Sequence, residues 1–123
     1  MFLVKHCLRI IWECQYSLPY PTAKKTNLQF WMLENPFGFL RRFLGNPTLI
    51  YQPYEFGDNY KKKTCVWGFF NMPKKNPIEC TMPKFDQLKT KEIHYDGYEH
   101  LTRTERRSIS SPGFVRAFYE ANR

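Results

Sequence analysis

The chain has 123 residues, with a hydrophobic content of 42% and an aromatic content of 18%. That composition excludes a disordered polypeptide, and the length leaves room for one domain around one hydrophobic core. Lysine and arginine (19) outnumber aspartate and glutamate (11), which gives a net charge of +8. The charge favours a polyanion such as DNA as the partner, although solubility alone would account for it equally well.

Targeting and redox features favour an intracellular protein. Lys5, Arg9 and Glu13 interrupt the apolar N-terminal segment, which excludes a signal peptide and a membrane span there. We therefore expect a cytoplasmic protein. No C-x-x-C spacing joins any of the cysteines, which predicts reduced core thiols and no bound metal. The cysteines are Cys7, Cys14, Cys65 and Cys80.

The first elements along the chain are a predicted helix, loop and strand. Apolar residues recur at helical spacing over residues 2–15, with Arg9 and Glu13 placed as an i, i+4 ion pair. Prolines and lysines mark 17–27 as a loop, and LQFWML (28–33) is typical of a strand buried on both faces. Helix, loop and buried strand together predict half of a parallel α/β unit.

A short helix and two further strands follow. Apolar residues after Pro36 predict a helix of roughly two turns that ends at Gly45, where glycine suits a left-handed cap. Strands are expected over residues 48–52 and 64–71. In the second of these, Gly68 indicates a bulge or a close approach of another backbone.

The C-terminal part predicts a long loop and a final helix. Residues 72–100 show no periodicity, so 72–107 is expected to form a variable basic loop region within the single domain. Ser111 is a suitable N-cap and Pro112 a suitable first helical residue. Residues 108–123 therefore predict a C-terminal helix that packs on the core formed by residues 1–71.

Glu34 is the main candidate for chemistry. It follows the most strand-like run directly, and ligands of open α/β sheets bind beyond the carboxyl ends of strands. Neighbouring aromatic rings would partly desolvate its carboxyl group, which favours the protonated form and lets it donate a proton near neutral pH. The alternative is an ordinary turn, with Asn35 and Pro36 as loop residues and Glu34 capping the next helix.

Two basic segments are candidates for DNA contact. Lys61, Lys62 and Lys63 precede a predicted strand and have tyrosines nearby, which suits a phosphate backbone with some base stacking. Arg106 and Arg107 precede the last helix and could contact phosphate. The simpler alternatives are a solvated run of charge for the lysines, and pairing with nearby glutamates for the arginines.

The chain carries, in this order, a strand that ends in ENP (34–36), the block PYEFGDNYKKKTCVWG (53–68) and SPGFVRAFYEAN (111–122). Together these segments resemble the C-terminal part of the cytosine-5 DNA methyltransferase-like proteins of phages and prophages. The ENP step (34–36) is similar to the ENV step of cytosine-5 methyltransferases. The block PYEFGDNYKKKTCVWG (53–68) resembles their Y-G-V-P-Q-x-R-x-R segment, with lysines in place of arginines and Tyr60 at the glutamine position. SPGFVRAFYEAN (111–122) is similar to their closing segment. The resemblance covers about residues 28–71 and 108–122, and weakly the first helix. It implies that the cell is bacterial or phage-infected.

The resemblance implies a Rossmann-like class I S-adenosylmethionine-dependent methyltransferase fold, present here as an incomplete sheet with flanking helices. It implies methyl transfer to a cytosine flipped out of DNA, in which a cysteine attacks C6 and a glutamate holds or protonates N3. Glu34 would be that glutamate, with Asn35 and Pro36 supporting the base and its loop. Lys62 and Lys63 would position the base pocket or the DNA backbone.

Two motifs of the family, the F-x-G-x-G cofactor loop and the Pro-Cys nucleophile, do not occur in this sequence. Cys7 and Cys14 precede the ENP strand, so neither replaces the nucleophile by position. We therefore expect the C-terminal half of such an enzyme, truncated or acting with a separately encoded N-terminal half. It would be inactive alone and would bind S-adenosylmethionine only when completed.

Two other interpretations stay open at this stage. The chain could be a small basic DNA-binding or accessory protein without catalytic activity. It could also be a remnant whose exposed aromatic face has lost its partner and which tends to aggregate.

Overall fold

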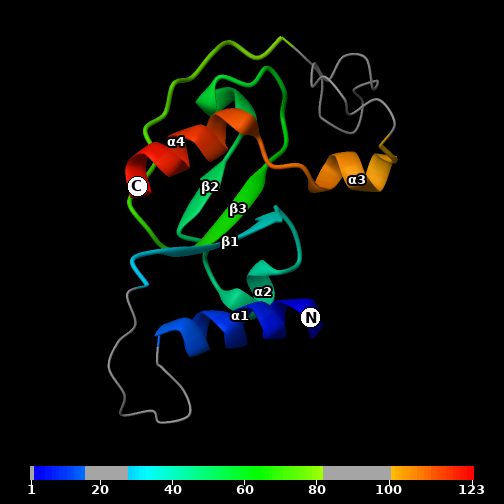
Figure 1. Ribbon diagram of the computed structural model, residues 1–123. Helices are drawn as coiled ribbons and strands as arrows, with labels where there is room; N and C mark the ends of the chain where they lie inside the picture. The colour runs from blue at the N-terminus through cyan, green and yellow to red at the C-terminus, as the bar shows by residue number, and fades with distance from the viewer. Residues whose placement is uncertain (1, 16–27, 82–100) are drawn as a thin grey trace.

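A three-stranded sheet with helices on both of its faces forms the centre of the molecule (Figure 1). The computed structural model describes residues 2–15, 28–81 and 101–123. The expected α/β class is confirmed. The strands are β1 (Trp31–Pro36), β2 (Leu49–Tyr51) and β3 (Thr64–Phe69), and the helices are α1 (Phe2–Gln15), α2 (Arg41–Leu44), the 3-10 helix η1 (Pro53–Phe56), α3 (Arg103–Ser108) and α4 (Pro112–Asn122).

The sheet has the order β1-β3-β2, and β3 runs antiparallel to both of its neighbours. The predicted parallel pairing is therefore wrong for the described strands. An apolar run indicates a strand but not the direction of its neighbour, which is set here by the chain reversal between β2 and β3. One consequence is that β1 and β2 point the same way, with β3 inserted between them.

One face of the sheet carries an aromatic core beneath α4. The buried ring of Tyr51 stacks on Phe114 with centroids 4.1 Å apart, and the Phe56 ring lies edge-on to both. Val66 of β3 and Phe118 of α4 complete this core. Because offset and edge-to-face ring pairs add to the area that they bury, the α4 face is the better packed side of the sheet.

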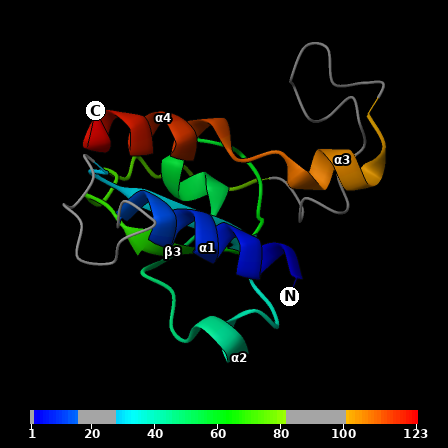
Figure 2. The same ribbon diagram turned by 60° about the horizontal axis from the view of Figure 1, so that its bottom comes forward.

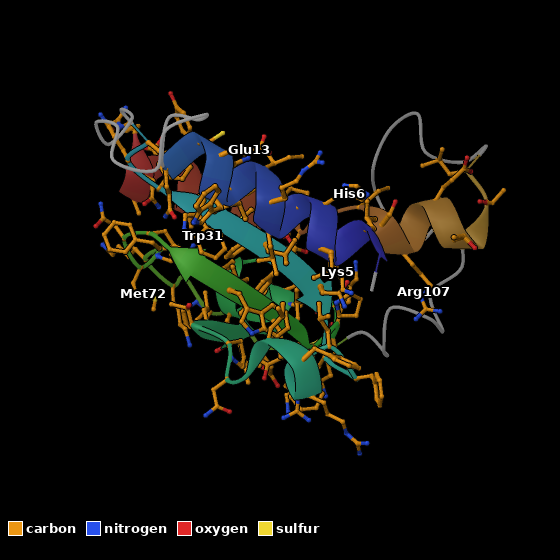
Figure 3. The ribbon with its side chains drawn as sticks, turned by 90° about the horizontal axis from the view of Figure 1, so that it is seen from below. Lys5, His6, Glu13, Trp31, Met72 and Arg107 are labelled. Carbon is orange, nitrogen blue, oxygen red and sulfur yellow. The ribbon has the colours of Figure 1, made fainter. Side chains whose placement is uncertain are left out.

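The opposite face of the sheet carries a smaller core. Leu40, Cys65 and Trp67 are buried there, and Val4 of α1 and Leu44 of α2 pack against them. The Trp67 indole N–H donates to the Gly45 carbonyl at 3.1 Å, so the end of α2 is fastened to the sheet. Figure 3 shows α1 lying along β1 on this side.

Glycine 68 has the role that its position in a strand predicted. A Cβ at Gly68 would overlap the Trp31 carbonyl oxygen and crowd the Met32 backbone, so the close backbone approach is confirmed. The helix over residues 2–15 is also confirmed, with Arg9 Nε and Glu13 Oε1 3.6 Å apart. Residues 16–27, predicted as a loop, lie outside the described residues.

Other expectations need correction. β1 is half-buried rather than buried on both faces, because it is an edge strand of the described sheet and Leu28 and Phe30 before it are exposed. The helix after Pro36 has a single turn, since residues 37–40 form bends and turns before it. Part of the predicted 72–107 loop region is helical, because Thr102 and Glu105 form a reciprocal capping box for α3.

The cysteines are all reduced in this structure, as expected, but only one of them belongs to the core. Cys65 is buried, Cys7 and Cys80 are half-buried and Cys14 is exposed. Burial raises the pKa of the Cys65 thiol, while Arg41 and Lys63 lower it. This thiol is therefore held in its neutral form, which does not favour nucleophilic attack.

Candidate functional site

The carboxyl ends of β1 and β2 meet the amino end of β3 at one edge of the sheet. Thr64, the first residue of β3, lies opposite both Pro36 and Tyr51, the last residues of the other two strands. The Phe37 N–H donates to the Lys63 carbonyl at 2.8 Å, which continues the pairing one step beyond β1. We call this region the convergence edge, and the chain leading into α4 passes over it (Figure 1).

Glu34 lies within β1 and not after it, so the expected position beyond the strand is wrong. Its Cα lies opposite that of Val66, and pairing with β3 continues through Asn35 and Pro36. The apolar run marks only the part of the strand that packs on the core, whereas backbone pairing extends into polar residues. Pro36 is tolerated because it is the last residue of an edge strand.

The Glu34 side chain is on the α4 face, since it shares that face with Val66 of the aromatic core. Asn35 is exposed and lies opposite Cys65, so its side chain belongs to the other face. Glu34 is therefore separated from Asn35 by the sheet itself. The Glu34 side chain is therefore directed into the space between the sheet and the segment that precedes α4.

Two hydroxyl groups donate to the Glu34 carboxylate. Ser110 Oγ donates to Glu34 Oε2 at 3.0 Å, and the Tyr51 hydroxyl is hydrogen-bonded with Glu34 and Thr64. Burial, reinforced by the negative charge of Glu34, raises the pKa of Tyr51 far above its ordinary value, so the hydroxyl keeps its proton and donates it. A carboxylate offers about four acceptor positions, so about two remain for a ligand.

A second carboxylate, Asp58, holds the start of α4 close to Glu34. Asp58 Oδ2 accepts hydrogen bonds from Ser111 Oγ and from the Gly113 N–H at 2.8 Å. Ser111 Oγ in turn faces the Phe114 N–H, so the predicted N-cap is confirmed. Gly113 is required here because a Cβ would overlap the Phe56 carbonyl oxygen. A negative charge at a helix N-terminus is favourable.

Lysine 62 also fastens the segment that leads into α4. Its ammonium group donates to the carbonyl oxygens of Arg107 and Ile109, the latter at 3.1 Å. Lys62 therefore links the segment before β3 to two residues that lie 45 and 47 positions further along the chain. Lys61, in contrast, is exposed.

The other predicted cationic residues lie around the same edge. Lys63 is exposed and its ammonium nitrogen lies 3.9 Å from the centroid of the Phe37 ring. Arg107 is exposed and projects outward from α3 (Figure 3). The side chain of Arg106 lies outside what the structure describes. The convergence edge thus brings together Glu34, the three lysines and the backbone of Arg107.

Sequence reasoning missed three residues that build this site: Tyr51, Asp58 and Ser110. Asp58 lies within the block PYEFGDNYKKKTCVWG (53–68), and Ser110 directly precedes the predicted N-cap Ser111. Their contacts span 53 and 76 residues, and no local pattern encodes partners at that separation. The Gly-Asp step at 57–58 is the one available signal, because aspartate is among the residues that commonly cap helices.

Comparisons of the chain with protein-family models, with curated proteins and with solved structures gave no significant match. Among the described residues, no group of three or more histidine, cysteine, aspartate or glutamate side chains is placed to hold a metal ion. Likewise, the helices within residues 2–15, 28–81 and 101–123 are all too short or too polar to cross a membrane.

Proposed function

We propose that this chain is the C-terminal half of a DNA cytosine-5 methyltransferase, in which Glu34 recognises a cytosine flipped out of the duplex. The observation that carries the proposal is the position of Glu34 near the carboxyl end of β1, hydrogen-bonded to Ser110, which directly precedes the closing segment. Ligands of open α/β sheets bind beyond the carboxyl ends of strands, and Glu34 lies two residues before that end of β1. The chain alone would not transfer a methyl group.

Contacts among the three segments behind the resemblance support the proposal. The ENP segment meets the lysine block through the hydrogen bond between the Phe37 N–H and the Lys63 carbonyl. It meets the C-terminal part of the resemblance (108–122) through the hydrogen bond between Ser110 and Glu34, and Lys62 joins the block to Ile109 of that part. Segments that are far apart in sequence thus assemble around one carboxylate, as parts of a single site would.

A Rossmann-like class I methyltransferase fold remains part of the proposal on the resemblance alone. β1 and β2 point the same way but are not neighbours, and both pairs of adjacent strands in the described sheet are antiparallel. Within the described residues, β1 pairs with β3 alone. Its other side could therefore pair with a strand of an N-terminal half.

The chemistry assigned to Glu34 follows from its remaining acceptor positions. An ionised glutamate can accept a hydrogen bond from the cytosine N4 amino group, and a protonated one can donate to N3. Protonation at N3 withdraws electrons from the ring and so assists attack at C6. The nucleophilic thiolate and the S-adenosylmethionine site would come from the N-terminal half, since Cys65 is buried on the opposite face.

A second candidate function is DNA binding without catalysis. It is favoured by the two hydrogen bonds that Glu34 accepts, because they would suffice to explain a purely structural glutamate. The exposed Lys61, Lys63 and Arg107 would then provide salt-sensitive binding to the phosphate backbone. The two functions differ in whether Glu34 discriminates between bases.

The first test measures base recognition by the chain alone. Fluorescence anisotropy compares duplexes that carry an unpaired cytosine or thymine opposite an abasic site, where base flipping costs least. We expect a preference for cytosine that Glu34→Gln removes, since the single amide oxygen accepts from Ser110 and Tyr51 and leaves no acceptor for the cytosine N4 amino group. Glu120→Gln, an exposed glutamate on α4, is the matched control.

The second test measures catalysis by the completed enzyme. The chain is co-expressed with an N-terminal half that carries F-x-G-x-G and Pro-Cys, and transfer of labelled methyl groups to DNA is followed. We expect transfer only with both halves, abolished by Glu34→Gln. Methyl transfer by the isolated chain would refute the proposal. Binding that ignores both the base and Glu34→Gln would favour the non-catalytic function.

A further inference from the structure

The short segment around α2 exposes aromatic rings between arginine side chains. Phe39 is 64% exposed and Phe43 is 52% exposed, and their ring centroids are 5.2 Å apart in an edge-to-face arrangement. Figure 2 shows α2 standing out from the body of the molecule, on the side away from α4. Two large rings at a projecting turn are accessible to a ligand.

These two rings are not needed for the core. Leu40 and Leu44 pack against the sheet, as does Phe37 before them, and Leu40 and Leu44 are four positions apart on one side of the turn. Phe39 and Phe43 have the same spacing but lie on the outer side. Their exposure is therefore built into the helical geometry of α2 and is not a consequence of poor packing.

Cations accompany the rings throughout this surface. The Arg41 guanidinium carbon lies 3.9 Å from the centroid of the Phe37 ring, and the Lys63 ammonium nitrogen lies at the same distance from that ring. The Arg42 guanidinium carbon lies 5.1 Å from the Phe39 centroid. Cation–π contacts of this kind hold the charges beside the rings while leaving them solvent-accessible.

We infer that this surface, comprising Phe39, Phe43, Arg41, Arg42 and Lys63, binds an unpaired DNA strand. Exposed aromatic rings stack on the faces of unpaired bases, and adjacent cations contact the phosphates between them. A duplex hides its base faces, so the rings would give preference to unpaired DNA. A purely electrostatic site would not need exposed phenylalanines.

The surface is continuous with the convergence edge through Lys63. The Lys63 carbonyl accepts from the Phe37 N–H directly after the ENP step, and its ammonium group reaches the Phe37 ring. A base flipped toward Glu34 leaves its former partner in the opposite strand unpaired. The choice of DNA rests on the proposed function, whereas the stacking surface itself does not involve Glu34.

The test measures anisotropy of a labelled 12-nucleotide single strand and of the matching duplex. We expect Phe39→Ala/Phe43→Ala to weaken single-strand binding by roughly 5- to 100-fold, from stacking of one or two bases, with a much smaller effect on the duplex. Phe69→Ala is the matched control, because Phe69 is 70% exposed and lies at the far end of β3. It should leave both affinities unchanged.

The arginines give an independent measure. Arg41→Gln and Arg42→Gln should each reduce the slope of log affinity against log salt for the single strand by about 0.7. Unchanged single-strand affinity in Phe39→Ala/Phe43→Ala would overturn the inference. An equal loss for single strand and duplex would do so as well. Ring-dependent binding to anionic vesicles, with no effect of the rings on DNA, would assign the surface to a membrane instead.

The two proposals fail separately. If Glu34→Gln abolishes the cytosine preference while the phenylalanine variant binds single strands normally, the stacking surface is refuted and the proposed function stands. If the cytosine preference is absent while Phe39→Ala/Phe43→Ala weakens single-strand binding, the proposed function is refuted and the stacking surface stands. Circular dichroism of every variant verifies that the fold is retained.

Discussion

Replacement of Asp58 by alanine should strongly destabilise the packing of α4. The carboxylate accepts hydrogen bonds from Ser111 Oγ and the Gly113 N–H, at a helix N-terminus where negative charge is favoured. Hydrogen bonds to charged groups contribute about 1.5–3 kcal/mol each, and half-burial of Asp58 places them at the lower end. We expect Asp58→Ala to lower the free energy of unfolding by about 2–4 kcal/mol.

Urea unfolding followed by circular dichroism measures this change. With a denaturant dependence of about 2 kcal/mol per molar urea, the unfolding midpoint should fall by roughly 1–2 M. Asp58→Asn keeps one acceptor oxygen and removes the charge, so its cost should be about 1 kcal/mol. Glu79→Ala is the control, because Glu79 is exposed and its loss should stay within about 0.5 kcal/mol.

A double-mutant cycle with Ser111→Ala isolates the contact itself. Since Ser111 donates to Asp58, the two substitutions should be non-additive by at least about 0.5 kcal/mol. A loss below about 0.5 kcal/mol for Asp58→Ala, with full additivity, would show that this cap does not hold α4 in solution. Asp58→Ala should also weaken the preference for cytosine, because Ser110, which donates to Glu34, directly precedes the N-cap Ser111.

Three further predictions concern the same architecture. Lys62→Met should lower stability by about 1–3 kcal/mol in urea unfolding, since it removes two hydrogen bonds to backbone carbonyls. Lys61→Met should instead leave stability unchanged and reduce the slope of log affinity against log salt for duplex DNA by about 0.9. Asn122→Ala should cost about 2–3 kcal/mol, because the buried amide both accepts from the Asn71 N–H at 2.7 Å and donates to the Asn71 carbonyl at 3.0 Å. Burial and the adjacent carboxylate raise the pKa of Tyr51 in the folded state above its unfolded value near 10. The contribution of the neutral Tyr51 hydroxyl to stability is therefore complete below pH 10 and is lost above it, at about 1.4 kcal/mol per pH unit. Tyr51→Phe should reduce the difference in stability between pH 9 and pH 11, and an unchanged difference would contradict the raised pKa of Tyr51.

Features determined by neighbouring residues could be predicted from the sequence. The spacing of apolar residues located α1, and the serine–proline pair located the start of α4. Gly68 was correctly associated with a close backbone approach, because few other reasons place glycine in a strand. The capping box of α3 was present in the sequence as Thr102 and Glu105 but was not used.

Features determined by distant partners could not be predicted in this way. The direction of β3 relative to β1 depends on a chain reversal, and the apolar pattern of either strand fits both directions. Asn122 is buried although it is polar, because its amide pairs with the backbone of Asn71. The site depends equally on such partners, since Glu34 was identified by its position and Ser110 only by the fold.

The ties that hold the closing segment determine how Glu34 can act. Ser110 bonds to Glu34, Lys62 bonds to the carbonyls just before it, and Asp58 bonds to the residues just after it. Each tie contributes about 1 kcal/mol or more, and they fix one short segment, so local opening must disrupt them together. The hydroxyl of Ser110 is therefore held in place before any ligand arrives. A glutamate orientated in this way loses little entropy on binding a base, which is the property that preorganised recognition requires. The same fixation would be unnecessary for a glutamate that only contributed surface charge.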